Sequence, residues 1–280
     1  DVYKRQDLPL IKSLLPHSYD TVLEPFCGGA AVSFALADRC ILNDMNDALI
    51  NMYRQVSHPT TFHDVFSHVN WLKTLEHDDL SVEYYKARDY INGKHVDPYT
   101  WAISYITVRQ LCFSGMERYN KAGKFNVPFG HYKKFSCNLD WNHMKFLHQS
   151  GSSIFHGDFE RIFDMAGKDD FIFIDPPYLD RLGYAHGSDT LHERLVSCMK
   201  KSKAKWMFIH SDNDFYRDAL SDYHIMYKQF GYAQRFGKNK NHDAAQVSHM
   251  YVTNYEDDMT LHRVNNASLQ TLLEPDRIEA

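Results

Sequence analysis

The stretch Phe171-Ile172-Phe173-Ile174-Asp175-Pro176-Pro177-Tyr178 places an apolar run directly before a proline-rich turn. A short run of aromatic and β-branched residues is typical of a strand that is buried on both faces of a parallel sheet. The two prolines fix their own φ angles and make the turn rigid. Such a turn aims Asp175, the Pro176 carbonyl and Tyr178 at one point beyond the carboxyl end of the strand, where open α/β sheets bind their ligands.

Similar short apolar runs occur on both sides of this stretch and alternate with helix-like segments. We expect strands at Thr21–Leu23, Arg39–Leu42, Ser153–His156, Phe171–Ile174, Lys205–Ile209 and His224–Tyr227, with Met250–Asn254 as an added edge strand. We expect helices at Ala31–Ala37, Ala48–Val56 and Leu191–Lys201. The alternation predicts an α/β fold with a Rossmann-like, doubly wound sheet.

The alternation stops between residues 56 and 151, where the sequence is helix-like and rich in turns but has no convincing buried strand. We therefore expect residues 1–55 and 152–258 to form one discontinuous domain, residues 56–151 to form an inserted, mainly helical one, and residues 259–280 to be a polar tail. Within the insert, Arg118–Lys134 has five Lys or Arg residues, no acid, interleaved aromatics and an Ala122-Gly123 turn. This pattern predicts a basic β-hairpin.

The composition limits the possible classes of protein. A chain of 280 residues with 44% hydrophobic and 24% charged residues can bury a core, so we expect a globular protein. Its five widely spaced cysteines include no C-x-x-C pair and its 17 histidines show no ligand spacing, so we expect a reducing compartment and no metal. No apolar run approaches the length of a membrane span, and the net charge of −5 argues against coating nucleic acid by bulk charge.

Three further strand ends carry groups that suit a nucleoside ligand. Two glycines in Glu24–Ala30 precede a helix and allow a close approach of the backbone, although a Gly-Gly turn is also plain punctuation between strand and helix. Asp44 lies sixteen positions after Gly28, where a carboxylate can accept hydrogen bonds from ribose hydroxyls; a helix N-cap is the alternative. Asp158 could accept from an adenine amino group, with Phe159 packed on the ring.

The turn at residues 175–178 suits chemistry on an exocyclic amino group. An amino nitrogen on adenine is a poor nucleophile, because its lone pair is delocalised into the ring. If Asp175 and the Pro176 carbonyl each accept one amino hydrogen, the nitrogen can become more tetrahedral and direct its lone pair at an electrophile. Tyr178 offers a surface on which a base outside the duplex can stack.

Together these motifs resemble the Dam-type DNA adenine methyltransferases, which transfer methyl from S-adenosylmethionine to N6 of adenine in GATC. The resemblance rests on Glu24–Ala30, Asn43-Asp44, Phe113–Tyr132, Asp158-Phe159 and Asp175–Tyr178, in the order that the family shows. It implies a methyltransferase sheet with an inserted target-recognition domain, S-adenosylmethionine as cofactor and S-adenosylhomocysteine as product. The implied catalytic residues are Asp175, Pro176, Pro177 and Tyr178. The implied cofactor site comprises Lys4, Glu24, Phe26, Cys27, Gly28, Gly29, Asp44, Asp158, Phe159 and Asp175.

The resemblance also implies contacts with double-stranded DNA. Phe113 would wedge into the base stack, and Arg118 would read an outer guanine in the major groove. Met116 and Pro128 would make apolar contacts to a thymine methyl. Phosphates would be contacted by His131, Tyr132 and Lys133. Further implied contacts are Ser114, Asn120, Lys121, Lys124 and Asn126. From the residues alone, Phe113 could be a core aromatic, Arg118 could pair with Glu117, and the lysines could form a solvated face.

We therefore expect a cytoplasmic DNA N6-adenine methyltransferase, in a bacterial or phage-infected cell, that flips its target base at GATC. We expect a monomer, with a dimer on DNA as the alternative, and no membrane partner. N4-cytosine or RNA amino methylation remains an alternative, as does a sequence-specific DNA-binding module that turns over weakly. The chain opens without the glycine pair that family members carry near Lys4, so we expect an incomplete amino-terminal segment.

Overall fold

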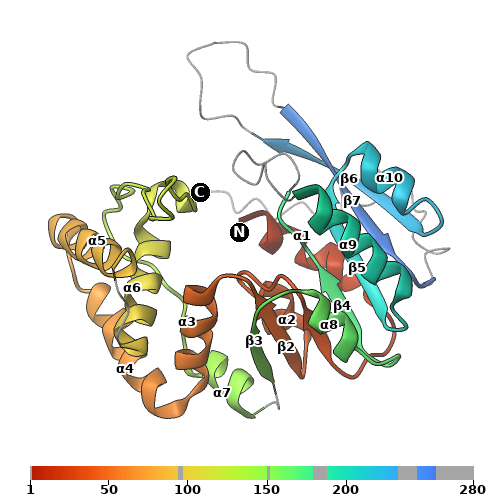
Figure 1. Cartoon of the computed structure of the whole chain (residues 1–280). Coiled ribbons are helices and arrows are strands. Elements are labelled where there is room, and N and C mark those ends of the chain that lie inside the picture. Colours follow the sequence, from red (N-terminus) through yellow and green to blue (C-terminus); the bar gives the residue numbers. More distant parts are fainter. Residues whose placement is uncertain (1, 94–96, 150–151, 179–187, 233–244, 257–280) are drawn as a thin grey trace, which may run out of the picture.

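A seven-stranded sheet of order β3-β2-β1-β4-β5-β7-β6 forms the centre of the computed structural model (Figure 1). The structure describes residues 2–93, 97–149, 152–178, 188–232 and 245–256. The strands are β1 (Val22–Glu24), β2 (Cys40–Asp44), β3 (Ser153–His156), β4 (Phe171–Ile174), β5 (Lys205–Ser211), β6 (His224–Tyr232) and β7 (Ala245–Thr253). The first five strands pair in parallel, while β7 is antiparallel to both β5 and β6. This arrangement confirms the doubly wound α/β sheet.

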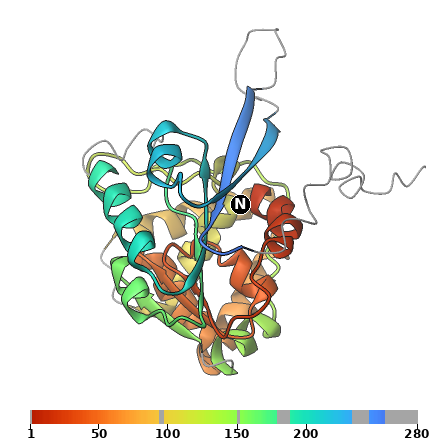
Figure 2. The same ribbon diagram turned by 90° about the vertical axis from the view of Figure 1, so that its right-hand side faces the viewer.

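The last strand of the chain corrects one expectation. Met250–Asn254 was expected at an edge, but β7 lies inside the sheet, between β5 and β6. The physical reason is burial: Met250, Tyr251 and Val252 are at most 1% exposed, so both faces of this segment are covered. Figure 2 shows the amino-terminal part of β7 and the end of β6 extending beyond the rest of the sheet as a two-stranded ribbon.

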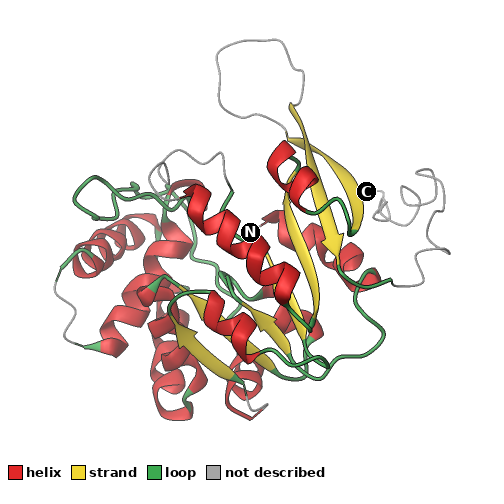
Figure 3. Ribbon diagram, turned by 45° about the vertical axis from the view of Figure 1, so that its right-hand side comes forward, coloured by secondary structure: helices red, strands yellow, loops and turns green. Residues whose placement is uncertain are grey.

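Helices cover the two faces of the sheet (Figure 3). They are α1 (Val2–Ser13), α2 (Ala31–Leu36), α3 (Asp47–Ser57), α4 (Pro59–Leu72), α5 (His77–Ile91), α6 (Pro98–Leu111), α7 (Trp141–Gln149), α8 (Glu160–Met165), α9 (Ser188–Lys201) and α10 (Asp214–Ala219), with a short 3-10 helix η1 (Phe113–Gly115). Within the parts of the chain given above, no helix is long and apolar enough to cross a membrane.

Alternating side chains along the strands divide the core between the two faces. In β4, Ile172 and Ile174 pack into the cluster that includes Leu195 of α9, whereas Phe171 and Phe173 pack on the opposite face with Ile11 of α1. This is the period of two that a strand imposes on its side chains. All four strand residues are at most 2% exposed, which explains why the sequence of β4 is apolar without interruption.

The insert is mainly helical, as the sequence predicts, and Figure 1 shows α4, α5 and α6 grouped beside the sheet. Its core is continuous with the sheet. One cluster of buried side chains runs from Cys40 and Leu42 of β2, through Ile50 of α3, to Phe62 of α4 and Val108 of α6. The insert therefore packs against the sheet through α3, and buried side chains of both parts belong to the same cluster.

The expected β-hairpin at residues 118–134 is present but short. Its two sides are joined by a single bridge between Tyr119 and Phe125, with hydrogen bonds from Asn120 N to Lys124 O and from Asn126 N to Arg118 O. The extended ribbon that the pattern predicts does not form among the described residues. The reason is that side chains of the insert donate to backbone carbonyls that a longer ribbon would use for its own hydrogen bonds. Asn92 Nδ2 donates to Phe125 O at 2.9 Å, and the Tyr84 hydroxyl donates to Val127 O at 2.7 Å.

Candidate active site

The carboxyl ends of the parallel strands bring the predicted site loops to one edge of the sheet. β1 and β4 are neighbours, with Val22 opposite Phe171 and Leu23 opposite Ile172. Parallel neighbours in register end at the same edge, so the Glu24–Ala30 loop lies beside the Asp175–Tyr178 turn. β2 and β3 follow on the other side of β1 and bring Asp44 and Asp158 to the same edge.

The glycine loop is open to a ligand on its outer side. Gly28 has a φ of +46°, and a Cβ added at Gly28 or Gly29 would meet nothing within 4 Å. The loop is held from beneath, because Gly28 N donates to Asp44 Oδ2 at 3.1 Å and the Tyr53 hydroxyl donates to Gly28 O at 2.8 Å. The N-cap alternative for Asp44 is not realised, since Asn46 caps α3 by accepting from Leu49 N at 3.1 Å. This backbone fits a ligand that approaches the loop closely.

Two predicted cofactor residues point into the protein instead. Glu24 is 2% exposed and accepts a hydrogen bond from Ser33 N at 2.8 Å, near the start of α2. Cys27 is fully buried in the core cluster that continues into the insert. These side chains support the loop from inside. Lys4 falls in α1, but its side chain lies outside the described residues.

Asn43 is a structural residue of the site that the sequence did not single out as a site residue. Its side chain is 1% exposed, and Nδ2 donates to Pro25 O at 3.0 Å and to Gly157 O at 2.9 Å. One amide group thus joins the loop after β1 to the loop after β3. The signal in the sequence is a polar residue at an inward position of an otherwise buried strand.

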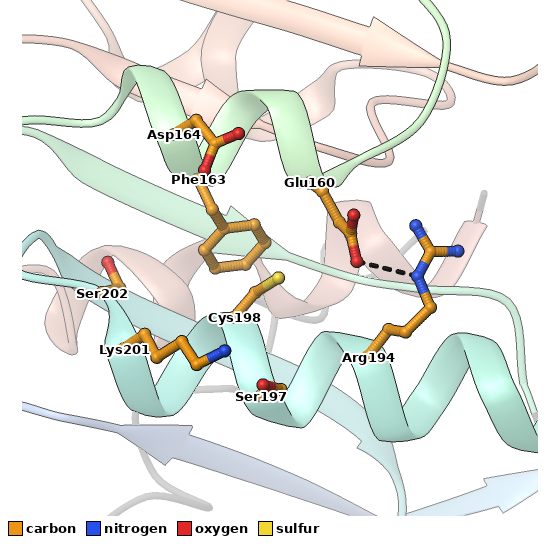
Figure 4. Close-up of a pocket in the computed structure, with 8 residues that line it drawn as sticks. All are labelled: Glu160, Phe163, Asp164, Arg194, Ser197, Cys198, Lys201 and Ser202. Carbon is orange, nitrogen blue, oxygen red and sulfur yellow. Dashed lines mark hydrogen bonds and ion pairs between the residues drawn. The ribbon is translucent and has the colours of Figure 1, made fainter.

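The loop after β3 is fastened by an arginine on α9. Arg194 bonds Asp158 Oδ2 at 2.8 Å and Glu160 Oε1 at 2.7 Å, and its guanidinium lies over the Phe159 ring. Figure 4 shows the contact between Arg194 and Glu160. Burial opposes ionisation of Asp158, but hydrogen bonds from Glu160 N and Arg194 outweigh it and lower the pKa of this carboxyl. Phe159 is 3% exposed and contacts the Phe26 ring, with centroids 5.2 Å apart. Asp158 is thus held as a carboxylate beside an aromatic wall.

The turn after β4 is backed by buried rings. Pro176 is buried, while Asp175, Pro177 and Tyr178 are half-buried. The Tyr178 ring lies 5.0 Å from the ring of His210 in β5 and 5.9 Å from that of His249 in β7, measured between centroids. Burial lowers the pKa of His249, although the nearby carboxylates of Asp7 and Asp175 oppose this.

A buried ion pair braces the same region. Asp7 of α1 is 2% exposed at its side chain and lies 2.8 Å from Lys228 Nζ of β6. Burial and then the Asp7 carboxylate raise the pKa of the Tyr251 hydroxyl, which therefore stays protonated. Among the residues that the structure describes, no three His, Cys, Asp or Glu side chains gather as a metal site.

The predicted DNA-contact residues form an exposed strip on the insert. Burial alternates along the returning chain, where Phe125, Val127 and Phe129 are at most 3% exposed. The exposed positions are Ser114, Met116, Arg118, Asn120, Lys121, Lys124, Asn126, Pro128, His131, Tyr132 and Lys133. Phe113 is half-buried and packs against the core of the insert, which agrees in part with the alternative that it is a core aromatic.

Arg118 does not make the surface ion pair that was its alternative. Its Nε donates to Asn126 Oδ1 at 2.8 Å and its Nη2 to Asn126 O at 3.2 Å, across the hairpin. Glu117 instead pairs with Arg109, with 3.5 Å between Oε2 and Nη1. Because a guanidinium carries five N–H donors, Arg118 keeps an outer edge available for a bidentate partner.

Comparisons of the sequence with known proteins identify a family and several relatives. A family model described as D12 class N6 adenine-specific DNA methyltransferase matches residues 3–234. Type II methyltransferase M.CviBI of Paramecium bursaria Chlorella virus NC1A is 29% identical over 263 residues, which are 90% of this chain and 96% of that protein. Type II methyltransferase M1.LlaDCHI of Lactococcus lactis subsp. cremoris is 30% identical over 271 residues, which are 90% of this chain and 92% of that protein. A DNA adenine methylase of Haemophilus influenzae is 31% identical over 172 residues, which are 60% of this chain and 58% of that protein.

Proposed function

Because this chain belongs to the D12 class N6 adenine-specific DNA methyltransferase family, we propose that it methylates the adenine of GATC in double-stranded DNA after flipping that base out of the duplex. The observation that carries the proposal is the position of the Asp175–Tyr178 turn beside the open glycine loop, at the common carboxyl edge of β1 and β4. A target base and a nucleoside cofactor could therefore meet across two neighbouring strands.

The turn supplies the groups that the amino nitrogen of adenine needs. Asp175 and the Pro176 carbonyl accept the two amino hydrogens, so that the nitrogen lone pair turns out of the ring plane. Asp175 takes up a proton as positive charge develops on nitrogen. Tyr178 stacks on the base, and the rings of His210 and His249 support it from behind.

The cofactor of this proposal is S-adenosylmethionine, with S-adenosylhomocysteine as product. Its sulfonium supplies an electrophilic methyl group. The residues present fit it: the backbone at Gly28 and Gly29 is open, Asp44 lies at the end of β2, and Phe26 with Phe159 forms an apolar wall. Arg194 keeps Asp158 ionised and in place.

The exposed strip on the insert supports double-stranded DNA as the partner. Arg118 is fixed by Asn126 and presents its outer edge toward solvent, which suits bidentate recognition of guanine O6 and N7. Met116 is 39% exposed and Pro128 is also exposed, so that either could contact a thymine methyl. The lysines of the strip would set register through phosphates. We also propose that the protein acts as a monomer in the cytoplasm of a bacterial or phage-infected cell.

A plasmid assay tests the site and the reaction together. Unmethylated plasmid is incubated with the protein and S-adenosylmethionine, then cut separately by a nuclease that requires N6-methylated GATC and by one that this mark blocks. We expect the first cut to appear and the second to disappear. If neither changes while tritiated methyl enters the DNA, the GATC assignment is wrong. Nucleoside analysis then distinguishes N6-methyladenine from N4-methylcytosine, and a GATC-dependent gel shift without any methyl transfer would indicate a binding module.

A further inference from the structure

The carboxylate of Glu117 joins the recognition segment of the insert to the cofactor edge of the sheet. Asn46 Nδ2 donates to Glu117 Oε1 at 2.9 Å, and the Tyr119 hydroxyl donates to the same oxygen at 3.0 Å. Arg109 Nη1 lies 3.5 Å from Glu117 Oε2 and also donates to Met116 O at 3.2 Å. The Glu117 carboxylate thus pairs with Arg109 of α6 and accepts hydrogen bonds from Tyr119 of the hairpin and from Asn46, the residue that caps α3.

On the cofactor side, Asn46 is tied to the glycine loop through Asp44. Asn46 N donates to Asp44 Oδ1 at 2.9 Å, and Asp44 Oδ2 accepts from Gly28 N at 3.1 Å. The side chain of Asn46 is held in turn, because its Oδ1 caps α3 at Leu49 N. A continuous series of hydrogen bonds therefore runs from Glu117 to the loop proposed to hold the cofactor.

On the DNA side, Glu117 directly precedes Arg118, the residue proposed to read guanine. Burial and then the Glu117 charge raise the pKa of the Tyr119 hydroxyl, so this group remains a proton donor to the carboxylate. The Glu117 side chain is 36% exposed, so water weakens its contacts in the free protein. Bound DNA would remove that water and strengthen the same contacts, because the local dielectric falls.

We propose that Glu117, acting through Asn46, is a positioning residue that couples cofactor binding at the Gly28 loop to DNA binding at the Arg118 hairpin. The inference rests on the proposed function, since it needs a cofactor at one end and DNA at the other. A coupling of this kind is reciprocal: each ligand tightens the other by the same factor. Glu117 itself touches neither reacting atom.

The test measures DNA affinity with and without S-adenosylhomocysteine, so it requires no turnover. Fluorescence anisotropy gives the dissociation constant of a labelled GATC duplex in both states, and calorimetry gives that of S-adenosylhomocysteine with and without the duplex. Each experiment gives a ratio, which is the dissociation constant without the second ligand divided by the dissociation constant with it. For the unaltered protein we expect both ratios to be about ten, within the common range of allosteric coupling. In Glu117→Ala we expect both ratios to fall to about 1–2. In Glu117→Gln an intermediate ratio is expected, because the amide oxygen still accepts from Asn46 but the charge is lost.

Asn92→Ala is the matched control. Asn92 also anchors the hairpin, since Phe125 N donates to Asn92 Oδ1 at 2.7 Å and Asn92 Nδ2 donates to Phe125 O, but both of these hydrogen bonds lie within the insert. We expect this variant to bind DNA more weakly while keeping the unaltered protein's ratio. Thermal unfolding followed by circular dichroism verifies that each variant is folded.

Three results would overturn the coupling: a ratio near one in the unaltered protein, an unchanged ratio in Glu117→Ala, or an equal fall in Asn92→Ala. Failure of the proposed function looks different. If the plasmid assay shows no GATC methylation while the ratios behave as expected, the target assignment is refuted and the coupling is supported.

Discussion

Replacing Asn43 with alanine gives the sharpest test of how the site is held together. Its buried amide donates to the carbonyls of Pro25 and Gly157, which belong to the loops after β1 and β3. Alanine removes both donors and leaves two carbonyls that water reaches poorly, since the Asn43 side chain is 1% exposed. The two loops then lose their shared attachment.

The expected loss follows from the hydrogen bonds. Each bond contributes about 1 kcal/mol net, and a buried carbonyl left without its donor adds a desolvation penalty, so the free energy of unfolding should fall by about 2–4 kcal/mol. The affinity for S-adenosylhomocysteine should fall with it, because both loops border the proposed cofactor site. Asn43→Asp should have a similar effect, because a carboxylate keeps the shape but cannot donate to either carbonyl.

Asn51→Ala is the matched control for this prediction. Asn51 Nδ2 makes one hydrogen bond, to Pro98 O at 2.8 Å, in a solvent-exposed position. Its loss should cost less than about 1 kcal/mol. Urea denaturation with linear extrapolation gives the free energies, and calorimetry gives the cofactor-product affinity. If Asn43→Ala costs no more than Asn51→Ala, the two loops do not depend on this amide and the reasoning is wrong.

Three further predictions concern the turn, the recognition hairpin and pH. Asp175→Ala should lower methyl transfer by at least about 100-fold in a tritiated-methyl assay while product and DNA binding persist; full activity would refute its role. Arg118→Ala should relax discrimination at one outer base pair by about 1–3 kcal/mol in duplex competition, whereas uniform weakening would make it a phosphate contact. His249 has a lowered pKa through burial, so folding opposes its protonation and stability should decrease as pH falls below about 6.5. His249→Gln should flatten this dependence in urea denaturation at pH 5–7.5, and an unchanged slope would contradict it.

Features that depend on local sequence were predicted well. The bounds of β3 and β4 agree with the expected Ser153–His156 and Phe171–Ile174, because each is a short apolar run closed by polar or turn residues. The position of the proposed catalytic turn at Asp175–Tyr178 follows from the same pattern. The hairpin was also recognised, but its length was not, since the competing donors Tyr84 and Asn92 lie elsewhere in the insert.

Features that depend on long-range pairing could not be predicted. Asp7 and Lys228 are 221 positions apart, and nothing local to either residue reveals the partner. The place of β7 inside the sheet is similar, because an apolar strand does not specify which neighbours cover it. Arg194 was not singled out for the same reason: its partners Asp158 and Glu160 come from a different strand-to-helix loop.

The continuous core from β2 through α3 to α4 and α6 bears on how new target sequences could arise. A chimera that exchanges residues 56–151 between relatives would cut through packed side chains and create mismatched cavities on both sides. The exposed positions of the hairpin carry no such constraint and can change singly. Specificity in this chain should therefore evolve, or be engineered, by point substitutions on a fixed scaffold, and unfolding should be a single cooperative transition in calorimetry.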